Sequence, residues 1–287
     1  MSAATYDLHT HTLWSDGTLS PADLIARAQA SGVAVLALTD HDVTGGIAEG
    51  YAAATQAGVR LIPGVEISVT WQGETVHVLG LCIRPEHEPL QQGLARLREF
   101  RDWRAEEIGR RLRKKNIEGA YDYARGIARG PIISRTHFAR FLVARGYVST
   151  MGQAFKQYLA RGRAAHVPEQ WAKLDEVVGW VRGAGGLAVI AHPTRYPFGY
   201  GKLRRLLQEF KESGGAGVEV SSGMQRPGDG ETIARLAVEL DLLGSAGSDF
   251  HGPEQQWLEV GKLAPVAPPV VPVWTAFAPE YREVSTR

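Results

Sequence analysis

The chain has 287 residues, of which 44% are hydrophobic and 22% charged, and its formal net charge is +1. This composition is typical of a globular protein with one large barrel or two modest domains. The near-neutral net charge argues against an extended nucleic-acid-binding surface. The single cysteine, Cys82, excludes an internal disulfide and a thiolate metal site of the zinc-finger type.

The sequence also indicates whether membrane spans, a signal peptide or local clusters of charge are present. No apolar stretch reaches the roughly 18 residues that a membrane span needs, and the first residues lack the pattern of a signal peptide. We therefore expect no membrane partner and a cytoplasmic location. The charge is uneven, because residues 96–163 hold 17 Lys or Arg against 6 Asp or Glu, whereas the rest of the chain holds 15 against 25. One basic segment thus lies inside an acidic remainder.

Short apolar, β-branched runs separated by helical patterns predict an α/β fold. A hairpin turn, WQGE at 71–74, is expected between the third and fourth runs. The first helical pattern, 20–32, has Ser20 as its cap, Pro21 in its first turn and Gly32 at its end. Strand–helix alternation favours parallel strands, and the length suits a single α/β barrel. The seven predicted strands are 5–11, 33–40, 59–67, 75–83, 186–193, 217–222 and 242–249.

The stretch from about residue 95 to 165 breaks this alternation. It contains one long polar helical pattern at 94–116 and a second that begins at Ser134, with no strand signal. We predict that residues 1–95 and 166–287 form the barrel and that residues 96–165 form a basic helical insertion covering the active site. The proline-rich stretch 264–274 is expected to run extended over the surface.

Histidines and carboxylates recur at or near the ends of the predicted strands. His9 and His11 are two residues apart and so share one face of the first strand, which by itself is weak evidence for a metal site. The pattern repeats along the chain, and in a parallel barrel the carboxyl ends of the strands meet at one mouth. The complete set is His9, His11, Asp16, His41, Glu66, His77, His192, Asp249 and His251.

These nine side chains predict a metal centre of more than one ion. Imidazole and carboxylate ligands suit Zn, Mn or Fe, and nine ligands are too many for one ion and fit three if a carboxylate such as Glu66 bridges. Three divalent ions with three carboxylates leave positive charge, which favours an anionic substrate such as a phosphate ester. Asp7, on the same strand face as His9, is a candidate to orient its imidazole.

The motifs DLHTHTLWSDGT, LALTDHD, GVEIS, HVLG, AHP and GSDFH resemble, in order, those of the PHP (polymerase and histidinol phosphatase) phosphoesterases. The resemblance covers residues 5 to 251 apart from the insertion. It implies a distorted seven-stranded (β/α) barrel with a catalytic trinuclear centre, with Mn²⁺ as the expected metal and Fe or Zn as alternatives. The implied ligands are His9, His11, Glu66 and Asp249 for one ion; Asp16, His41 and His251 for the second; and Glu66, His77 and His192 for the third.

Within that family the chain most resembles the 3′,5′-nucleotide bisphosphate phosphatases and a related group of exoribonucleases, through SRTHFARFLV in the insertion and AHPTRY. The resemblance implies that Arg135, with Ser134 and His137, holds the nucleotide, and that Arg195 faces the same pocket. The residues alone allow two interpretations. Ser134 and Arg135 could bind a phosphate at a helix N-terminus, or they could be a simple cap and a surface arginine, with His137 packed inside and Arg195 solvated.

We therefore predict a metal-dependent phosphatase that hydrolyses the 3′-phosphate of 3′,5′-nucleotide bisphosphates. Its partner would be a small nucleotide or short RNA, and no protein partner can be inferred. Alternatives are a 5′–3′ exoribonuclease on short 5′-phosphorylated RNA and a phosphatase of another small molecule such as histidinol phosphate. A metal amidohydrolase is disfavoured because Glu66 stands where those sites commonly have a bridging lysine. A non-catalytic nucleic-acid-binding module would not need so many ligands.

Overall fold

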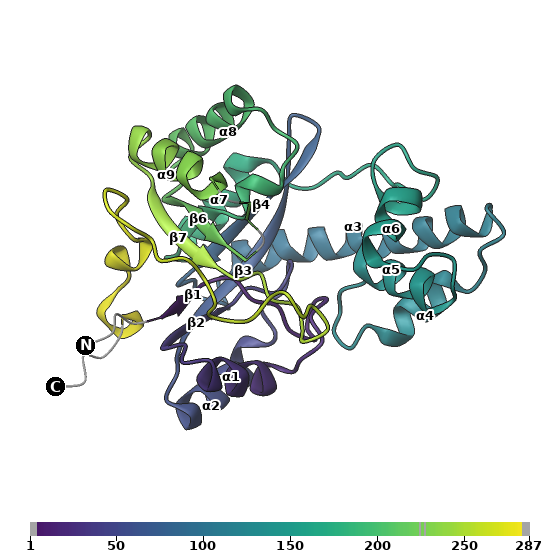
Figure 1. The fold of residues 1–287 in the computed structure, drawn as a ribbon, viewed down its shortest axis with the longest axis horizontal. Helices are drawn as coiled ribbons and strands as arrows, with labels where there is room; N and C mark the ends of the chain where they lie inside the picture. Colours follow the sequence, from purple (N-terminus) through teal and green to yellow (C-terminus); the bar gives the residue numbers. More distant parts are fainter. Residues whose placement is uncertain (1–4, 224, 227, 283–287) are drawn as a thin grey trace.

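A computed structural model describes residues 5–223, 225–226 and 228–282 of the chain. In this part, seven strands form one barrel-shaped sheet in the order β1 to β7, which confirms the predicted α/β barrel (Figure 1). The strands are β1 (Tyr6–Asp7), β2 (Val35–Leu38), β3 (Arg60–Trp71), β4 (Glu74–Leu81), β5 (Leu187–Ile190), β6 (Gly217–Ser222) and β7 (Leu243–Gly247).

One strand runs against the others. β4 is antiparallel to both β3 and β5, whereas all other neighbouring strands are parallel. Trp71 pairs with Glu74, so Gln72 and Gly73 form the two-residue turn, and both have positive φ (48° and 75°) as hairpin turns of this kind require. Because β4 is reversed, His77 near its beginning lies level with the carboxyl ends of the parallel strands.

The two ends of the sheet meet. The backbone N–H of Leu8 donates to the carbonyl of Ala246 at 2.9 Å, and Thr10 and Phe250 form a parallel bridge. The interior below the mouth is filled by apolar side chains from the strands and by Val273 and Phe277 from the C-terminal segment. The proline-rich stretch is mostly exposed, as predicted, but it also closes the amino end of the barrel.

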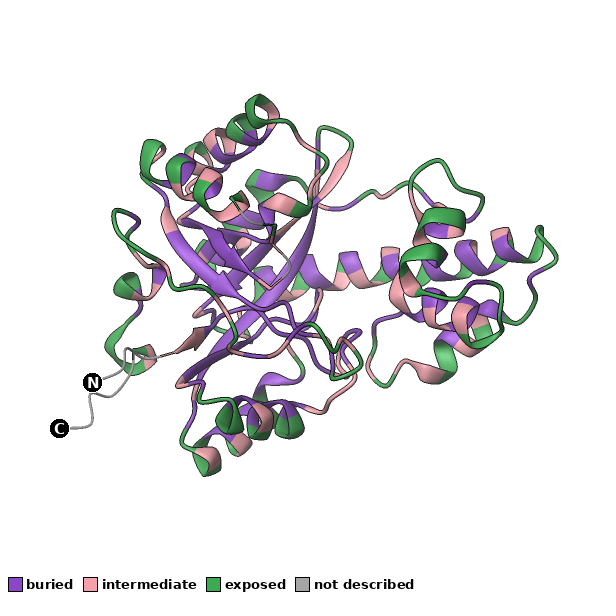
Figure 2. Ribbon diagram, viewed as in Figure 1, coloured by how far each residue is buried: buried purple, intermediate pink, exposed green. Residues whose placement is uncertain are grey.

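Helices cover the outside of the barrel and present buried apolar faces to it (Figure 2). In the first of them, Ser20 accepts a hydrogen bond from the backbone N–H of Asp23 at 3.1 Å, and Pro21 occupies the first turn, as the sequence predicts. No described helix is long and apolar enough to cross a membrane. The covering helices are α1 (Pro21–Ala30), α2 (Ile47–Ala57), α7 (Leu174–Gly183), α8 (Tyr200–Glu212) and α9 (Asp229–Glu239).

A group of helices projects from one side of the barrel (Figure 1). The longest, α3, packs its first turns on the barrel through Leu90, Leu94 and Leu97 and its later turns on a separate apolar cluster with Ile108 and Leu112. One continuous helix therefore joins the two cores. The group comprises α3 (Glu88–Arg113), α4 (Ala120–Ile127), α5 (Arg135–Ala144), α6 (Met151–Ala154) and a π-helical turn (Phe155–Leu159).

Candidate metal centre

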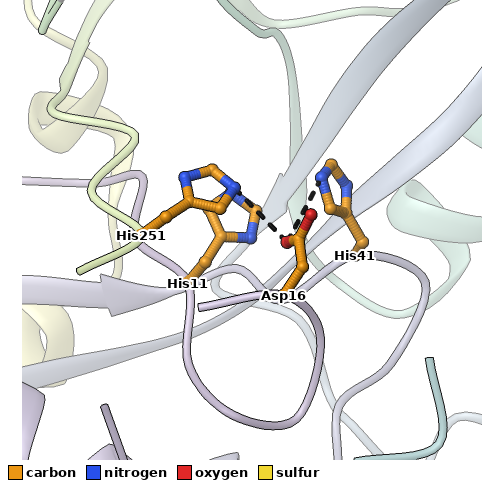
Figure 3. A group of neighbouring side chains, drawn as sticks. All are labelled: His11, Asp16, His41 and His251. Atoms are coloured by element: carbon orange, nitrogen blue, oxygen red, sulfur yellow. Dashed lines mark ion pairs between the residues drawn. The ribbon is translucent and has the colours of Figure 1, made fainter. Parts of the chain in front are cut away.

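The nine predicted histidines and carboxylates converge at one mouth of the barrel, and eight of them form three overlapping groups. In the first, one nitrogen or oxygen of each side chain lies within 4.8 Å of the others. Figure 3 shows Asp16 facing the rings: its Oδ1 lies 3.3 Å from Nε2 of His251 and 3.9 Å from Nε2 of His41. The first group is His11, Asp16, His41 and His251.

The second group lies deeper in the barrel. Its imidazoles are fully buried, and Nε2 of His9 and Nε2 of His11 are 3.1 Å apart. Oδ1 of Asp249 lies 3.2 Å from the His9 nitrogen and 3.0 Å from the His11 nitrogen. Backbone register explains this closeness, because the N–H of Asp249 donates to the carbonyl of His9 at 2.8 Å and holds the two strand ends side by side. The second group is His9, His11, Glu66 and Asp249.

Glu66 belongs to the second group and forms the third group with His41 and His77, and it also contacts His192. Its Oε2 lies 2.9 Å from Nδ1 of His41, and its Oε1 lies 2.9 Å from both Nδ1 of His77 and Nε2 of His192. The nitrogens of His77 and His192 are 3.3 Å apart. The strand register accounts for this arrangement, since His77 pairs with Ser68, two residues after Glu66 on the same face of β3.

The side chains fit divalent metal ions. Oδ1 of Asp16, Oε2 of Glu66 and Nδ1 of His41 lie close to other ligand atoms, but none of these buried atoms makes a hydrogen bond of good geometry. A buried polar atom is costly unless something satisfies it. Imidazole nitrogens and carboxylate oxygens crowd together there, and a cation among them would satisfy them all. This donor set, without a thiolate, suits Zn, Mn or Fe ions.

Electrostatics inside the group keep its carboxylates ionised. Burial raises the pKa of Glu66, but the charges of His41 and His77 outweigh burial and hold it well below its usual value. Burial lowers the pKa of His11, but hydrogen bonds with Asp249 and Glu66 raise it to about 10. A metal ion would thus meet charged carboxylates and would have to displace protons from imidazoles.

The prediction that Asp7 orients His9 is wrong. The Asp7 carboxylate accepts backbone N–H groups from Ser248 and Gly261, each at 2.8 Å, and from His9 at 3.4 Å, so it stabilises backbone and not the imidazole ring. The ring of His9 is held by Glu219, whose Oε1 lies 2.8 Å from Nδ1. Sequence analysis missed Glu219 because it lies in an ordinary strand pattern, GVEVSS, far from any ligand motif.

The predicted substrate-binding residues of the insertion lie against this centre. Ser134 caps α5, accepting from the N–H of Thr136 at 3.1 Å, and its hydroxyl also donates to Oδ2 of Asp16 at 2.9 Å. Nδ1 of His137 accepts the backbone N–H of Ser134 at 3.0 Å. Ser134 is therefore a helix cap and His137 is packed inside, and the Ser134 hydroxyl also contacts a candidate metal ligand, Asp16.

The two predicted arginines have carboxylate partners. Arg135 donates to Oε1 of Glu169 at 2.9 Å, and Arg195, in the short helix Pro193–Arg195, donates to Oδ2 of Asp249. The second contact places a guanidinium directly at the mouth, because Asp249 belongs to the second group. Arg195 is therefore not a solvated loop arginine.

Sequence analysis also missed Arg104. Its side chain is only 4% exposed and lies 4.6 Å from the ring centre of Trp171, its Nε has no hydrogen-bond partner, and its nearest carboxylate, Glu169, is 3.8 Å away. Burial, with repulsion from Arg135 and Arg101, lowers the pKa of Arg104 well below its usual value. The helical period could have revealed it, since Arg101 and Arg104 continue the buried stripe of Leu94 and Leu97.

Comparison with known proteins agrees with this geometry. Residues 7–160 match the PHP domain family, and this is more than half of the chain. The chain belongs to the PHP family. This PHP protein is 45% identical over 95% of its length to a Haemophilus influenzae protein named 5′-3′ exoribonuclease, of which 98% is covered. It is also 45% identical over 94% of its length to a Chromobacterium violaceum 3′,5′-nucleoside bisphosphate phosphatase, of which 95% is covered.

A solved structure agrees with this family assignment. The chain superposes with a TM-score of 0.83 on a Bifidobacterium adolescentis protein described as a metal-dependent phosphoesterase, at 29% identity and covering 96% of this chain and 95% of that one. Family membership and the clustered ligands make this PHP protein a metal-dependent hydrolase of phosphoesters. The two relatives differ in the activity they are named for.

Proposed function

We propose that this PHP protein is a phosphatase that removes the 3′-phosphate of 3′,5′-nucleotide bisphosphates, such as adenosine 3′,5′-bisphosphate, and leaves the 5′-monophosphate. One observation carries the proposal: Arg104 and Arg135 share a single carboxylate, Glu169, close to the candidate metal centre. Ser134, which contacts Asp16, directly precedes Arg135. The two arginines have more positive charge than the one carboxylate can neutralise. Such a site, separate from the centre that hydrolyses a phosphate, suits a substrate that carries two phosphates.

The metal centre in this proposal holds three divalent ions, with Mn²⁺ expected and Fe or Zn as alternatives. The three groups described above would hold them, with His192 completing the group of Glu66 and His77. Such ions activate water and screen the oxygens of a phosphoester. The chain's own residues bind and orient the substrate, and Arg195 at Asp249 is placed to bind the phosphate that is removed.

The 5′-phosphate is assigned to the arginine pair. Arg104 is almost fully buried and its Nε has no hydrogen-bond partner, whereas Arg135 is partly exposed; in this proposal a phosphate that binds Arg135 also accepts a hydrogen bond from Arg104. A cavity of about 470 Å³ beside Arg135, between the tip of the β3–β4 hairpin and the insertion, offers room for the rest of the nucleotide; Arg135, Arg161, His166 and Glu169 line it. His137 acts by holding Ser134 in place.

The test compares substrates with and without a 5′-phosphate. For Mn²⁺-loaded Arg104→Met we expect a KM for adenosine 3′,5′-bisphosphate about 10–100-fold above that of the unmodified protein, as for the loss of a hydrogen bond to a charged group. The KM for adenosine 3′-monophosphate should change little. Arg113→Met, at an exposed position of the same helix, is the matched control. An equal rise for both substrates would contradict the assignment.

The second candidate is a 5′–3′ exoribonuclease on short 5′-phosphorylated RNA, favoured by the name of the Haemophilus influenzae relative. The same centre would then cut the 3′-linkage of the first nucleotide, with its 5′-phosphate on the same arginines. Short 5′-phosphorylated RNA assayed in parallel separates the two. Stepwise release of mononucleotides without phosphate release from the bisphosphate would favour the exoribonuclease, and the reverse result would favour the phosphatase.

A further inference from the structure

A buried carboxylate, Glu219, joins two strand ends that carry candidate metal ligands. Glu219 lies on β6 and is 0% exposed. Its Oε1 lies 2.8 Å from Nδ1 of His9, and its Oε2 accepts the backbone N–H of His192 at 2.5 Å. Burying a carboxylate is costly unless hydrogen bonds satisfy it, and in the described part of the chain both of these bonds go to the two ligand residues.

The barrel makes a specific path for this side chain. β7 lies between β6 and the end of β1, so Glu219 reaches His9 by passing over β7. The residue of β7 at the crossing is Gly247. A Cβ added there would lie 2.3 Å from Cβ of His9 and 2.5 Å from Oε1 of Glu219, closer than real Cβ contacts. Only glycine leaves the space that this contact needs.

The contact fixes the chemical form of His9. A carboxylate at Nδ1 requires a proton on that nitrogen, and a neutral imidazole then has its lone pair on Nε2. Nε2 is the nitrogen that faces the centre, 3.2 Å from Oδ1 of Asp249 and 3.4 Å from Oε2 of Glu66. Glu219 therefore selects the tautomer and the ring orientation that a metal ion requires.

The second contact holds an unusual backbone. His192 has φ 29° and ψ 55°, in the left-handed region that residues with a side chain rarely adopt. This conformation directs Nε2 of His192 to within 2.9 Å of Oε1 of Glu66. The bond from the His192 N–H to Glu219 stabilises the backbone at that residue.

We propose that Glu219 is a positioning residue, which sets the imidazole of His9 and the backbone of His192 for binding divalent metal ions. The inference rests on the metal centre of the proposed function. It predicts an uneven effect, because Glu219 touches the group of His9 and the group of His192 but has no contact with Asp16, His41 or His251. Loss of Glu219 should weaken two ion sites and spare the third.

Metal binding without substrate tests this. Chelator-stripped protein is titrated with Mn²⁺ in equilibrium dialysis, and bound metal is counted by mass spectrometry. Glu219→Gln keeps one acceptor but turns an amide N–H₂ toward a donor, so we expect two ions to bind about 10–100-fold more weakly and one to bind unchanged. Glu231→Gln, on the exposed face of α9, should bind like the unmodified protein. At saturating Mn²⁺ the substrate KM of Glu219→Gln should be unchanged.

A second readout follows the tautomer itself. In Zn-loaded protein with ¹⁵N-labelled histidine, the Nδ1–H of His9 should give a strongly downfield proton signal that Glu219→Gln shifts or removes. If Glu219→Gln does not fold, Glu219→Asp, which keeps the charge and shortens the reach, should show a smaller loss at the same two sites.

The inference would be overturned if Glu219→Gln bound Mn²⁺ at every site as tightly as the unmodified protein does, or if its affinity fell equally at all three sites. Because no substrate is used, the predicted uneven loss of metal in Glu219→Gln, together with no hydrolysis of the bisphosphate by the unmodified protein, would overturn the proposed function alone. Unmodified protein that binds fewer than two ions would overturn both.

Discussion

A buried ion pair joins the insertion to the loop that carries His41. Arg101 on α3 is 4% exposed and Asp42 is 0% exposed, and the guanidinium Nε lies 2.7 Å from Oδ2 of Asp42. Nη2 of Arg101 also donates to Oγ of Ser68 at 2.8 Å. Arg101→Met keeps most of the buried volume but leaves the Asp42 carboxylate without its cation. Removing one partner of a buried pair costs about 3–5 kcal/mol, and we expect the free energy of unfolding to fall by that amount.

Equilibrium urea unfolding of metal-free protein measures this loss without the contribution of bound ions. The double variant Asp42→Asn with Arg101→Met should be more stable than the sum of the two single changes predicts, because it leaves no uncompensated charge. Arg113→Met on the exposed face of α3 should stay within about 0.5 kcal/mol of the unmodified protein. A loss below about 1 kcal/mol for Arg101→Met would refute the reasoning and mean that Ser68 alone satisfies Asp42.

Three further predictions test the centre and its surroundings. Glu66→Ala removes the carboxylate shared by the ligand groups and should lower bound metal and reduce phosphate release by more than about 100-fold; appreciable turnover would contradict its bridging role. Burial lowers the pKa of His137 to about 4, so the unfolded chain takes up this proton first as the pH falls. This residue alone should cost the metal-free protein about 3 kcal/mol between pH 6.5 and 4, and urea unfolding of His137→Asn should show a correspondingly smaller loss. Ser134→Ala removes a helix cap and a hydrogen bond to Asp16 and should cost about 2–4 kcal/mol, whereas Ser134→Thr should keep most of it; equal losses for the two would argue against a role for the hydroxyl.

The sequence by itself predicted the barrel and the candidate metal ligands at its mouth. Strands buried on both faces are continuous apolar runs. In a parallel barrel, a polar residue at the carboxyl end of such a run is expected to lie at the mouth of the barrel. His9 and His11 share a face because side chains alternate along a strand. The WQGE sequence predicted the hairpin that reverses β4 and brings His77 to the mouth. Local pattern was sufficient for these residues.

Only the tertiary structure decided which side chains support the ligands. Glu219 lies 210 positions from His9, and their contact exists because the sheet closes and Gly247 leaves a path between β6 and β1. In the sequence, Arg104 belongs to a polar helical pattern. The structure shows that it lies on the buried face of α3, beside Trp171. Sequence periodicity reports one element at a time, whereas the charge and hydrogen bonds of a buried group depend on elements far apart in the chain that packing brings together.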